Sequence, residues 1–112
     1  MKQIFITGNA GNDVEIFNDV NGKLFGAFQV AVRLNKTETE WMYVTCYDES
    51  LEYAKKHVKK GAKILVNGIP SVQLHVTKDG KTVANQRIYA KFIELQASKP
   101  DQFNRFDEYD YE

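Results

Sequence analysis

The sequence is short of the residue types that several functions need. It has one cysteine, Cys46, in 112 residues, so an internal disulfide and a zinc site built from cysteines are excluded. Its two histidines, His57 and His75, have no cysteine nearby and form no His-Glu-x-x-His pattern. A Gly-x-x-x-x-Gly-Lys-Ser/Thr phosphate loop and a Gly-x-Ser-x-Gly nucleophile elbow are also missing. We therefore expect a protein that is not an enzyme and uses no metal or other cofactor.

Long hydrophobic runs are missing as well. Hydrophobic residues make up 43% of the chain, but no apolar run has the length that a membrane-spanning helix needs. The N-terminus enters an alternation of apolar residues at 4–6, without a long apolar stretch and a cleavage site. We expect a cytoplasmic protein with no membrane partner. A chain of this length forms one domain with a small core.

The whole chain has a formal net charge of zero, but its two parts carry opposite net charges. Residues 98–112 hold two cations and five carboxylates, a balance of −3, so residues 1–97 carry +3. A basic body with an acidic tail is expected where one surface meets phosphate and another segment avoids it. Charge alone fits a solvated tail without a role equally well, but the aromatic residues favour a function. The partner-binding candidates are Phe106, Asp107, Glu108, Tyr109, Asp110 and Tyr111.

Turn signals divide the body into segments in which apolar and polar residues alternate, the pattern of half-buried strands. Asn21-Gly22 is a favoured pair for a tight hairpin turn, and residues 78–81 give another. The polar residues 35–40 predict a third hairpin loop. The predicted strand segments are 4–6 and 14–17, then 24–34, 41–47, 64–77 with a bend near Gly68 and Pro70, and 83–95.

One helix interrupts these strands. Asp48 is a candidate N-cap, and Leu51, Ala54 and Val58 recur at helical spacing. Asp48 and Glu49 then begin a helix and do not form an acid/base pair. Five strands with one helix after the third predict an all-β OB fold, a small closed barrel. In that fold, ligands lie across the second and third strands between two hairpin loops.

Residues 41–47 carry the clearest functional signal. On a strand, Trp41, Tyr43 and Tyr47 share one face, and Cys46 lies on the opposite, apolar face as core filler. This face is expected to be solvent-exposed and polar, so three aromatic rings with polar tips on it indicate a surface that stacks on flat partners. Nucleic-acid bases are the commonest such partners, and each stacked base contributes roughly 1–3 kcal/mol whatever its sequence.

Phosphates require cations beside these rings. Each candidate cation taken alone fits an ordinary solvated charge. As a group, however, they flank the aromatic strand, on its predicted wet faces or on two hairpin loops. The candidates are Arg33, Lys36, Lys78, Lys81, Arg87 and Lys91.

Four segments form a specific combination in their order and spacing: residues 8–15, 28–32, 39–41 and 60–68. Together they resemble the signature blocks of bacterial single-stranded DNA-binding proteins, and the resemblance covers nearly all of residues 1–97. It implies an OB-fold subunit that forms a homotetramer and coats single strands during replication, recombination and repair. It also implies a nucleoid-associated protein of the bacterial cytoplasm that recruits enzymes through its acidic C-terminal tail, residues 98–112.

The resemblance assigns base stacking to Trp41 and to Tyr47, where the family often has phenylalanine. His75 falls where many members have another stacking tryptophan. Lys36 lies near a further aromatic position that this chain lacks, which implies a lower DNA affinity than is typical. Tyr43 and Tyr89 stay open to either the DNA face or a subunit contact. Related barrels also form dimers, so the oligomer stays open too.

The tail departs from the family pattern. The usual acidic tip followed by Ile-Pro-Phe is missing, and the Gly/Gln/Pro-rich linker is almost absent. This departure suggests a mobile-element or specialised paralogue. Two alternatives to strand coating remain: an OB-fold adaptor that acts mainly through its tail, and a barrel that binds oligosaccharides through its tryptophan.

Overall fold

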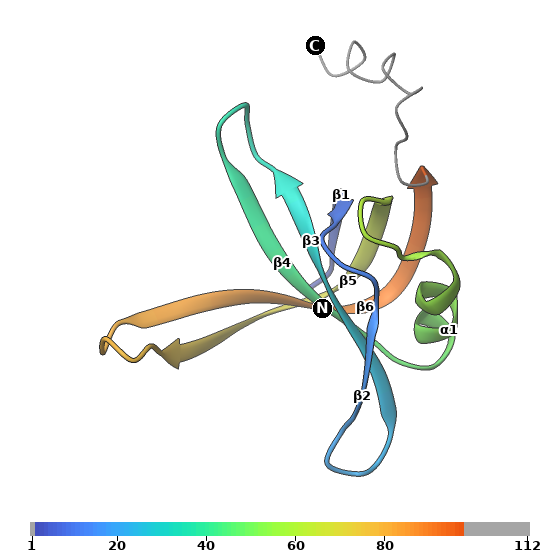
Figure 1. Ribbon diagram of the computed structural model, residues 1–112, viewed down its shortest axis with the longest axis horizontal. Helices are drawn as coiled ribbons and strands as arrows, with labels where there is room; N and C mark the ends of the chain where they lie inside the picture. The colour runs from blue at the N-terminus through green and yellow to red at the C-terminus, as the bar shows by residue number, and fades with distance from the viewer. Residues whose placement is uncertain (1, 98–112) are drawn as a thin grey trace.

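The computed structural model describes residues 2–97, which form strands and one helix (Figure 1). The all-β prediction with a single short helix is confirmed for this part of the chain. The elements are β1 (Ile4–Ala10), β2 (Glu15–Asn18), β3 (Leu24–Arg33), β4 (Thr39–Cys46), α1 (Asp48–His57), β5 (Lys63–Val76) and β6 (Thr82–Ala97).

The strands close into a barrel of five, in the order β1-β5-β6-β4-β3. Closure comes from β3, which returns to β1 where Asn9 pairs with Ala31 and Ala10 with Val30. β2 continues the path of β1 along β3, so the turn at residues 11–14 divides the first barrel strand in two. The helix predicted after the third barrel strand therefore follows β4, and the predicted architecture is confirmed.

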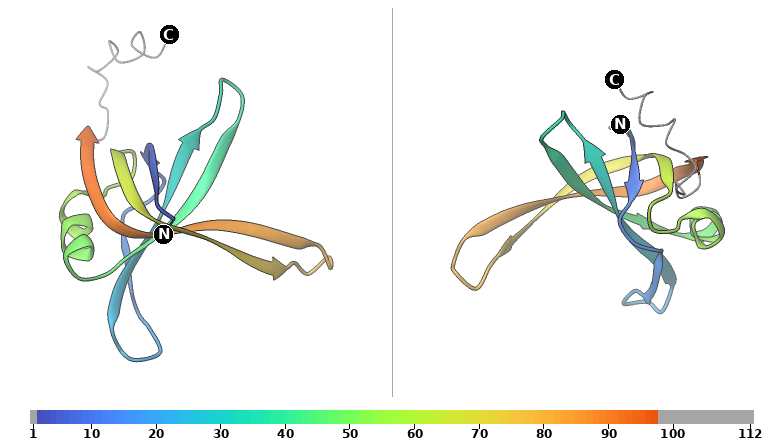
Figure 2. Two further views of the ribbon diagram at one scale, coloured as in Figure 1. Left: turned by 180° about the vertical axis from the view of Figure 1, so that it is seen from behind. Right: turned by 45° about the horizontal axis from the view of Figure 1, so that its top comes forward.

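Three hairpins project from the barrel in different directions (Figures 1 and 2). The β2–β3 turn is closed by the Asp19 N–H, which donates to the Lys23 carbonyl at 2.8 Å. The β5–β6 turn is closed in the same way by Thr77 and Lys81, also at 2.8 Å. β3 and β4 are joined by a short loop at residues 34–38. All three predicted hairpin connections are present.

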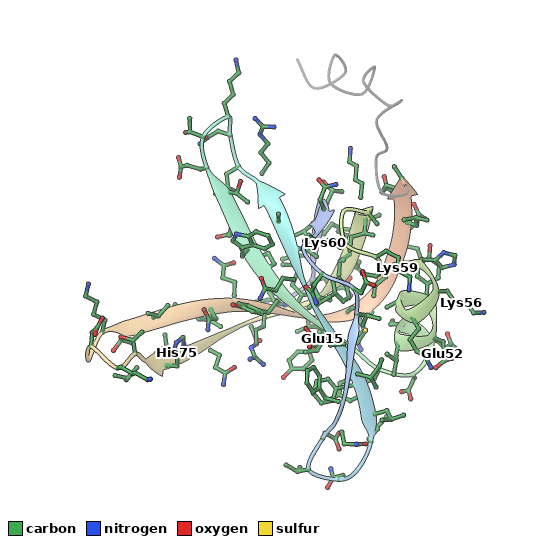
Figure 3. All side chains as sticks on the ribbon, viewed as in Figure 1. Glu15, Glu52, Lys56, Lys59, Lys60 and His75 are labelled. Atoms are coloured by element: carbon green, nitrogen blue, oxygen red, sulfur yellow. The ribbon has the colours of Figure 1, made fainter. Side chains whose placement is uncertain are left out.

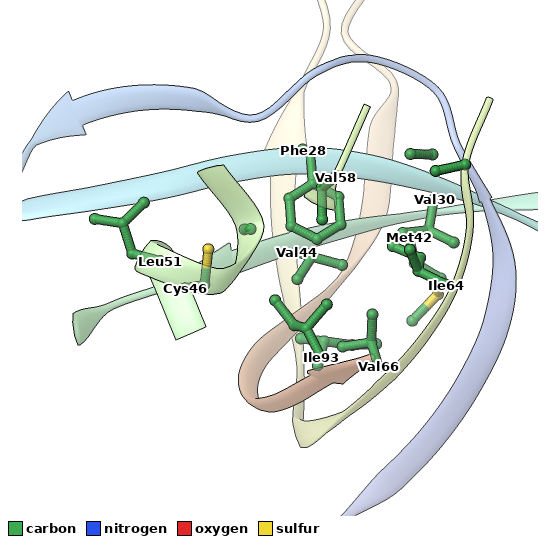
Figure 4. Close-up of a cluster of buried hydrophobic side chains, with 14 residues drawn as sticks. Phe28, Val30, Met42, Val44, Cys46, Leu51, Val58, Ile64, Val66 and Ile93 are labelled. Carbon is green, nitrogen blue, oxygen red and sulfur yellow. The ribbon is translucent and has the colours of Figure 1, made fainter. Parts of the chain in front are cut away.

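The core fills the barrel and continues under α1, which covers one end (Figure 4). β4 contributes Met42, Val44 and Cys46 to this core, as its alternation predicts. Cys46 is fully buried, and burial raises the pKa of its thiol to about 11. The buried residues are Ala10, Phe28, Val30, Met42, Val44, Cys46, Leu51, Ala54, Val58, Ala62, Ile64, Val66, Ile88 and Ile93.

The prediction that Asp48 caps the helix is wrong. Tyr47 occupies the N-cap position, without a side-chain cap hydrogen bond, and Asp48 follows it with a φ of +53°. The Asp48 carboxylate instead forms an ion pair with Lys23, whose Nζ lies 3.2 Å from Asp48 Oδ2. Because the β2–β3 hairpin brings this lysine to the start of α1, the carboxylate binds it in place of the helix amides.

Candidate nucleic-acid interface

The predicted aromatic face of β4 is present on the outside of the barrel. Trp41 is 49% exposed, whereas Tyr43 and Tyr47 are half-buried. Trp41 lies opposite Ala31 of β3, and Tyr43 lies opposite Gln29. Because Ala31 is small, it leaves nearly half of Trp41 exposed, as stacking on a flat ligand requires.

Trp41 is positioned by the turn between β1 and β2. A Cβ added to Gly11 would lie 2.6 Å from the indole Cζ3 and 3.1 Å from Cη2, so the ring covers this glycine. The Gly11 N–H donates to the Gln29 carbonyl at 2.8 Å, which fixes the turn against β3. The barrel thus supports the indole from one side while nearly half of it stays exposed.

A row of rings leads from β4 onto the β2–β3 hairpin. The ring centroids of Tyr47 and Phe25 are 5.5 Å apart, and those of Phe25 and Phe17 are 5.7 Å apart. Lys23 Nζ lies 5.4 Å from the Tyr47 centroid, within reach of a cation–π contact. Sequence reasoning missed both phenylalanines. The available signal was the alternation of β3, which places Phe25 on the same face as Gln29.

A groove of about 580 Å³ lies on the outer face of β3 and β4 beside these rings. The phenyl rings of Phe17 and Phe25 and the phenol of Tyr43 give it aromatic walls. Its polar lining includes Glu15 of β2 and Arg87 of β6. Arg87 reaches the groove because β6 runs parallel to β4 here and pairs it with Tyr43. The predicted site residues Tyr43 and Arg87 are therefore brought together.

Of the other predicted cations, four lie on the hairpins and outside this groove: Arg33, Lys36, Lys78 and Lys81. Arg33 Nε donates to the Asn35 carbonyl at 3.3 Å, and its Nη2 donates to that of Lys36 at 3.4 Å, so its guanidinium braces the β3–β4 loop. Lys36 is exposed on this loop, and Lys78 is exposed at the tip of the β5–β6 hairpin. The two loops predicted to flank the aromatic strand thus each carry an exposed cation.

His75 lies out along the β5–β6 hairpin, away from the barrel (Figure 3). Its Nδ1 is 3.1 Å from the Asn85 amide nitrogen. Two-residue alternation places it on the same hairpin face as Arg87, because Arg87 pairs with Ser71 in the same sheet. The histidine therefore extends the aromatic surface but does not contact the groove.

Tyr89, which the sequence left open, is 48% exposed and lines a second hollow of about 480 Å³. Tyr47 and Lys91 line the same hollow. The β4–β6 pairing places Tyr89 opposite Thr45, on the outer face that carries the other rings. The geometry associates Tyr89 with the aromatic surface.

Within residues 2–97, no three His, Cys, Asp or Glu side chains gather in a way that would hold a metal ion. The one helix of this region is too short and too polar to cross a membrane. The tail candidates lie outside the described residues: Phe106, Asp107, Glu108, Tyr109, Asp110 and Tyr111.

Comparison with known proteins agrees with the fold. Similar structures include the mitochondrial single-stranded DNA binding protein of S. cerevisiae, with a TM-score of 0.71 and 19% identity over 87% of this chain and 96% of that chain. The small single-stranded DNA-binding protein of Streptomyces coelicolor has the same TM-score and identity, over 85% and 94%. These likenesses support the barrel fold. Because residues 1–96 match the sequence profile of the Single-strand binding protein family, the chain belongs to that family.

Proposed function

We propose that this protein binds and protects single-stranded DNA with little dependence on base sequence. The observation that carries the proposal is the aromatic surface at β4: Trp41 and Tyr43 lie on the outer face of this strand, Tyr47 follows its last residue, and Tyr43 lines an open groove. Membership in the Single-strand binding protein family supports the same ligand. Trp41 and Tyr47 stack on bases, and each stacked base contributes about 1–3 kcal/mol. The protein performs no chemistry on the DNA.

Cations on three sides of the aromatic face contact the phosphates. Arg87 lies in the groove, Lys36 and Lys78 are exposed on separate hairpins, and Lys23 lies over the Tyr47 ring. A single strand of DNA that crosses β4 passes between these charges. Arg33 supports the path by bracing the loop that carries Lys36. Binding therefore weakens as salt rises, because each neutralised phosphate releases a counterion.

We also propose that the protein assembles as a homotetramer, with a dimer as the alternative. The outer face of β1, β5 and β6 supports an oligomer because it exposes large apolar residues. Phe5 is 68% exposed and Phe92 is 48% exposed, and both pair with Asn67. Exposed apolar patches of this kind mark contact surfaces.

The biological role that we propose is strand protection during replication, recombination and repair in the bacterial cytoplasm, at the nucleoid. Residues 1–97 form the DNA-binding domain, and residues 98–112 form an acidic aromatic tail that recruits replication and repair proteins. The charge balance of −3 in this tail and its four aromatic residues support that division. Its unusual ending fits a specialised or mobile-element paralogue.

Titration with a long oligo-thymidine at low and high salt tests the binding proposal. Trp41 is the single tryptophan, so its emission reports base stacking directly. Deep, saturable quenching that weakens with salt is expected. Unchanged emission together with no complex in a mobility assay would overturn the proposal and would leave the rings as candidates for a subunit interface.

A further inference from the structure

The groove beside β4 contains a carboxylate, which a surface that binds only phosphates would exclude. Glu15 lies where β2 leaves the barrel (Figure 3) and lines the groove together with Phe25 and Tyr43. A carboxylate repels the phosphates of a nucleic acid and lowers affinity for its backbone. The ligand groups that suit it are N–H donors, which single-stranded DNA presents only on its base edges.

A chain of hydrogen bonds connects Glu15, whose side chain is exposed, to the barrel. Asn12 Nδ2 donates to Glu15 Oε1 at 3.4 Å and to the Asp13 carbonyl at 2.7 Å. Asn12 Oδ1 accepts from the Gln29 backbone N–H at 3.0 Å. The asparagine therefore connects the carboxylate to β3, and within residues 2–97 the other oxygen, Oε2, has no hydrogen-bond partner.

Arg87 supplies unused donors to the same groove. Its Nε is buried and has no hydrogen-bond partner among the described residues. Arg87 and Glu15 line one groove without forming an ion pair with each other. Because Nε is buried, a ligand in the groove reaches Arg87 through its terminal Nη1 and Nη2, which have no hydrogen-bond or ion-pair partner within residues 2–97. Arginine contacts guanine O6 and N7 more often than any other base edge.

We propose that this groove is one guanine-preferring base subsite on a surface that elsewhere binds bases whatever their identity, an inference that rests on the proposed binding of single-stranded DNA. A guanine enters between the rings of Tyr43 and Phe25. The Glu15 carboxylate accepts hydrogen bonds from guanine N1–H and N2–H, and Arg87 donates to O6 and N7. Thymine has one N–H on its base edge, and adenine and cytosine lack the pair of N–H donors beside a carbonyl. Guanine alone serves both side chains at once.

Competition experiments test the subsite. A labelled oligo-thymidine is displaced by unlabelled oligomers that carry guanine at isolated positions, or adenine, inosine or 7-deazaguanine at the same positions. The affinity of the guanine oligomers in competition should exceed that of plain oligo-thymidine by about fivefold or more. This factor is the lower limit for one bidentate base contact. Inosine lacks the N2 amino group and 7-deazaguanine lacks N7, so each should lose part of this advantage.

The variant Glu15→Gln identifies the carboxylate as the cause. Measured as a ratio within each variant, the preference for guanine over inosine should vanish in Glu15→Gln. It should persist in Glu52→Gln, which makes the same charge change on α1, where Glu52 pairs with Lys55 at 3.5 Å (Figure 3). Equal affinity for guanine and thymidine oligomers, a preference for adenine, or a ratio unchanged in Glu15→Gln would overturn the subsite alone. Failure to bind any oligomer would overturn the proposed function as well.

Discussion

The indole of Trp41 covers Gly11, with so little space between them that an added Cβ would approach Cζ3 to 2.6 Å. Because the Gly11 N–H also binds the Gln29 carbonyl, the glycine is fixed and the indole must move if a side chain is introduced. We expect Gly11→Ala to shift the emission of Trp41 in the free protein. It should weaken oligo-thymidine binding by about 1 kcal/mol, the lower limit for one stacked base. Unchanged emission and affinity would show that the indole position does not matter.

The two main stacking residues can be tested by removing their rings. Trp41→Ala and Tyr47→Ala should each weaken binding by about 1–3 kcal/mol, the contribution of one base stacked on an aromatic side chain. Fluorescence anisotropy of a labelled oligo-thymidine measures both. Tyr47→Phe is the matched control for the second variant, because it keeps the ring that packs on Phe25. An equal loss in Tyr47→Phe and Tyr47→Ala would assign the effect to the hydroxyl.

The hairpin cations predict a change in salt dependence. Lys78→Ala should lower the slope of log K against log salt by about 0.7 if the lysine neutralises one phosphate of a single strand. Lys56→Ala on α1 removes the same charge from an exposed site on the helix (Figure 3) and should leave the slope unchanged. Equal slopes in the two variants would mean that the β5–β6 tip does not meet the DNA.

Cys46 predicts a dependence of stability on alkaline pH. Burial raises the pKa of its thiol from 9.0 to about 11, so the folded state favours the neutral form. The stabilisation is complete below pH 9.0 and is lost as pH rises through about 11, because the unfolded chain then gains from ionising the thiol. Urea denaturation across this range, compared with Cys46→Ala, isolates the effect. A thiol reagent should label Cys46 at mildly alkaline pH only after unfolding.

Deleting residues 98–112 separates strand coating from an adaptor role. If DNA binding is the main activity, the shortened chain should bind oligo-thymidine as well as the full chain or slightly better, since it loses a net charge of −3. Pull-down of replication and repair proteins should fail for the shortened chain. Loss of DNA binding on deletion would contradict the proposed role of residues 1–97.

The sequence predicted features that depend on local patterns. The two-residue alternation of β4 correctly placed Met42 and Val44 inside and Trp41 outside, because one face of a barrel strand is always buried. Turn-forming residues such as Gly22 and Gly80 marked two hairpin connections, since few other residues adopt the positive φ angles that these glycines have there.

Features that depend on long-range pairing could not be predicted in the same way. Arg87 enters the groove through a parallel contact between β4 and β6, and no local pattern specifies that register. Phe17 meets Phe25, and Phe25 meets Tyr47, only after the β2–β3 hairpin folds beside β4. The Asp48 cap failed for the same reason, because its partner Lys23 is distant in sequence.

The short closure of the barrel has a consequence for its motions. β1 meets β3 only at Asn9 and Ala10, whereas β3 pairs with β4 from Gly26 to Arg33. Local unfolding begins where a structure has the fewest interactions. The pairing of β1 with β3 should therefore open first. The sheet of β3 and β4 would stay intact during such opening, and its amides would exchange with solvent last. Ala31 pairs with both Asn9 and Trp41, so the pairing of β1 with β3 lies directly beside the indole, and its opening would remove part of the support of that stacking residue.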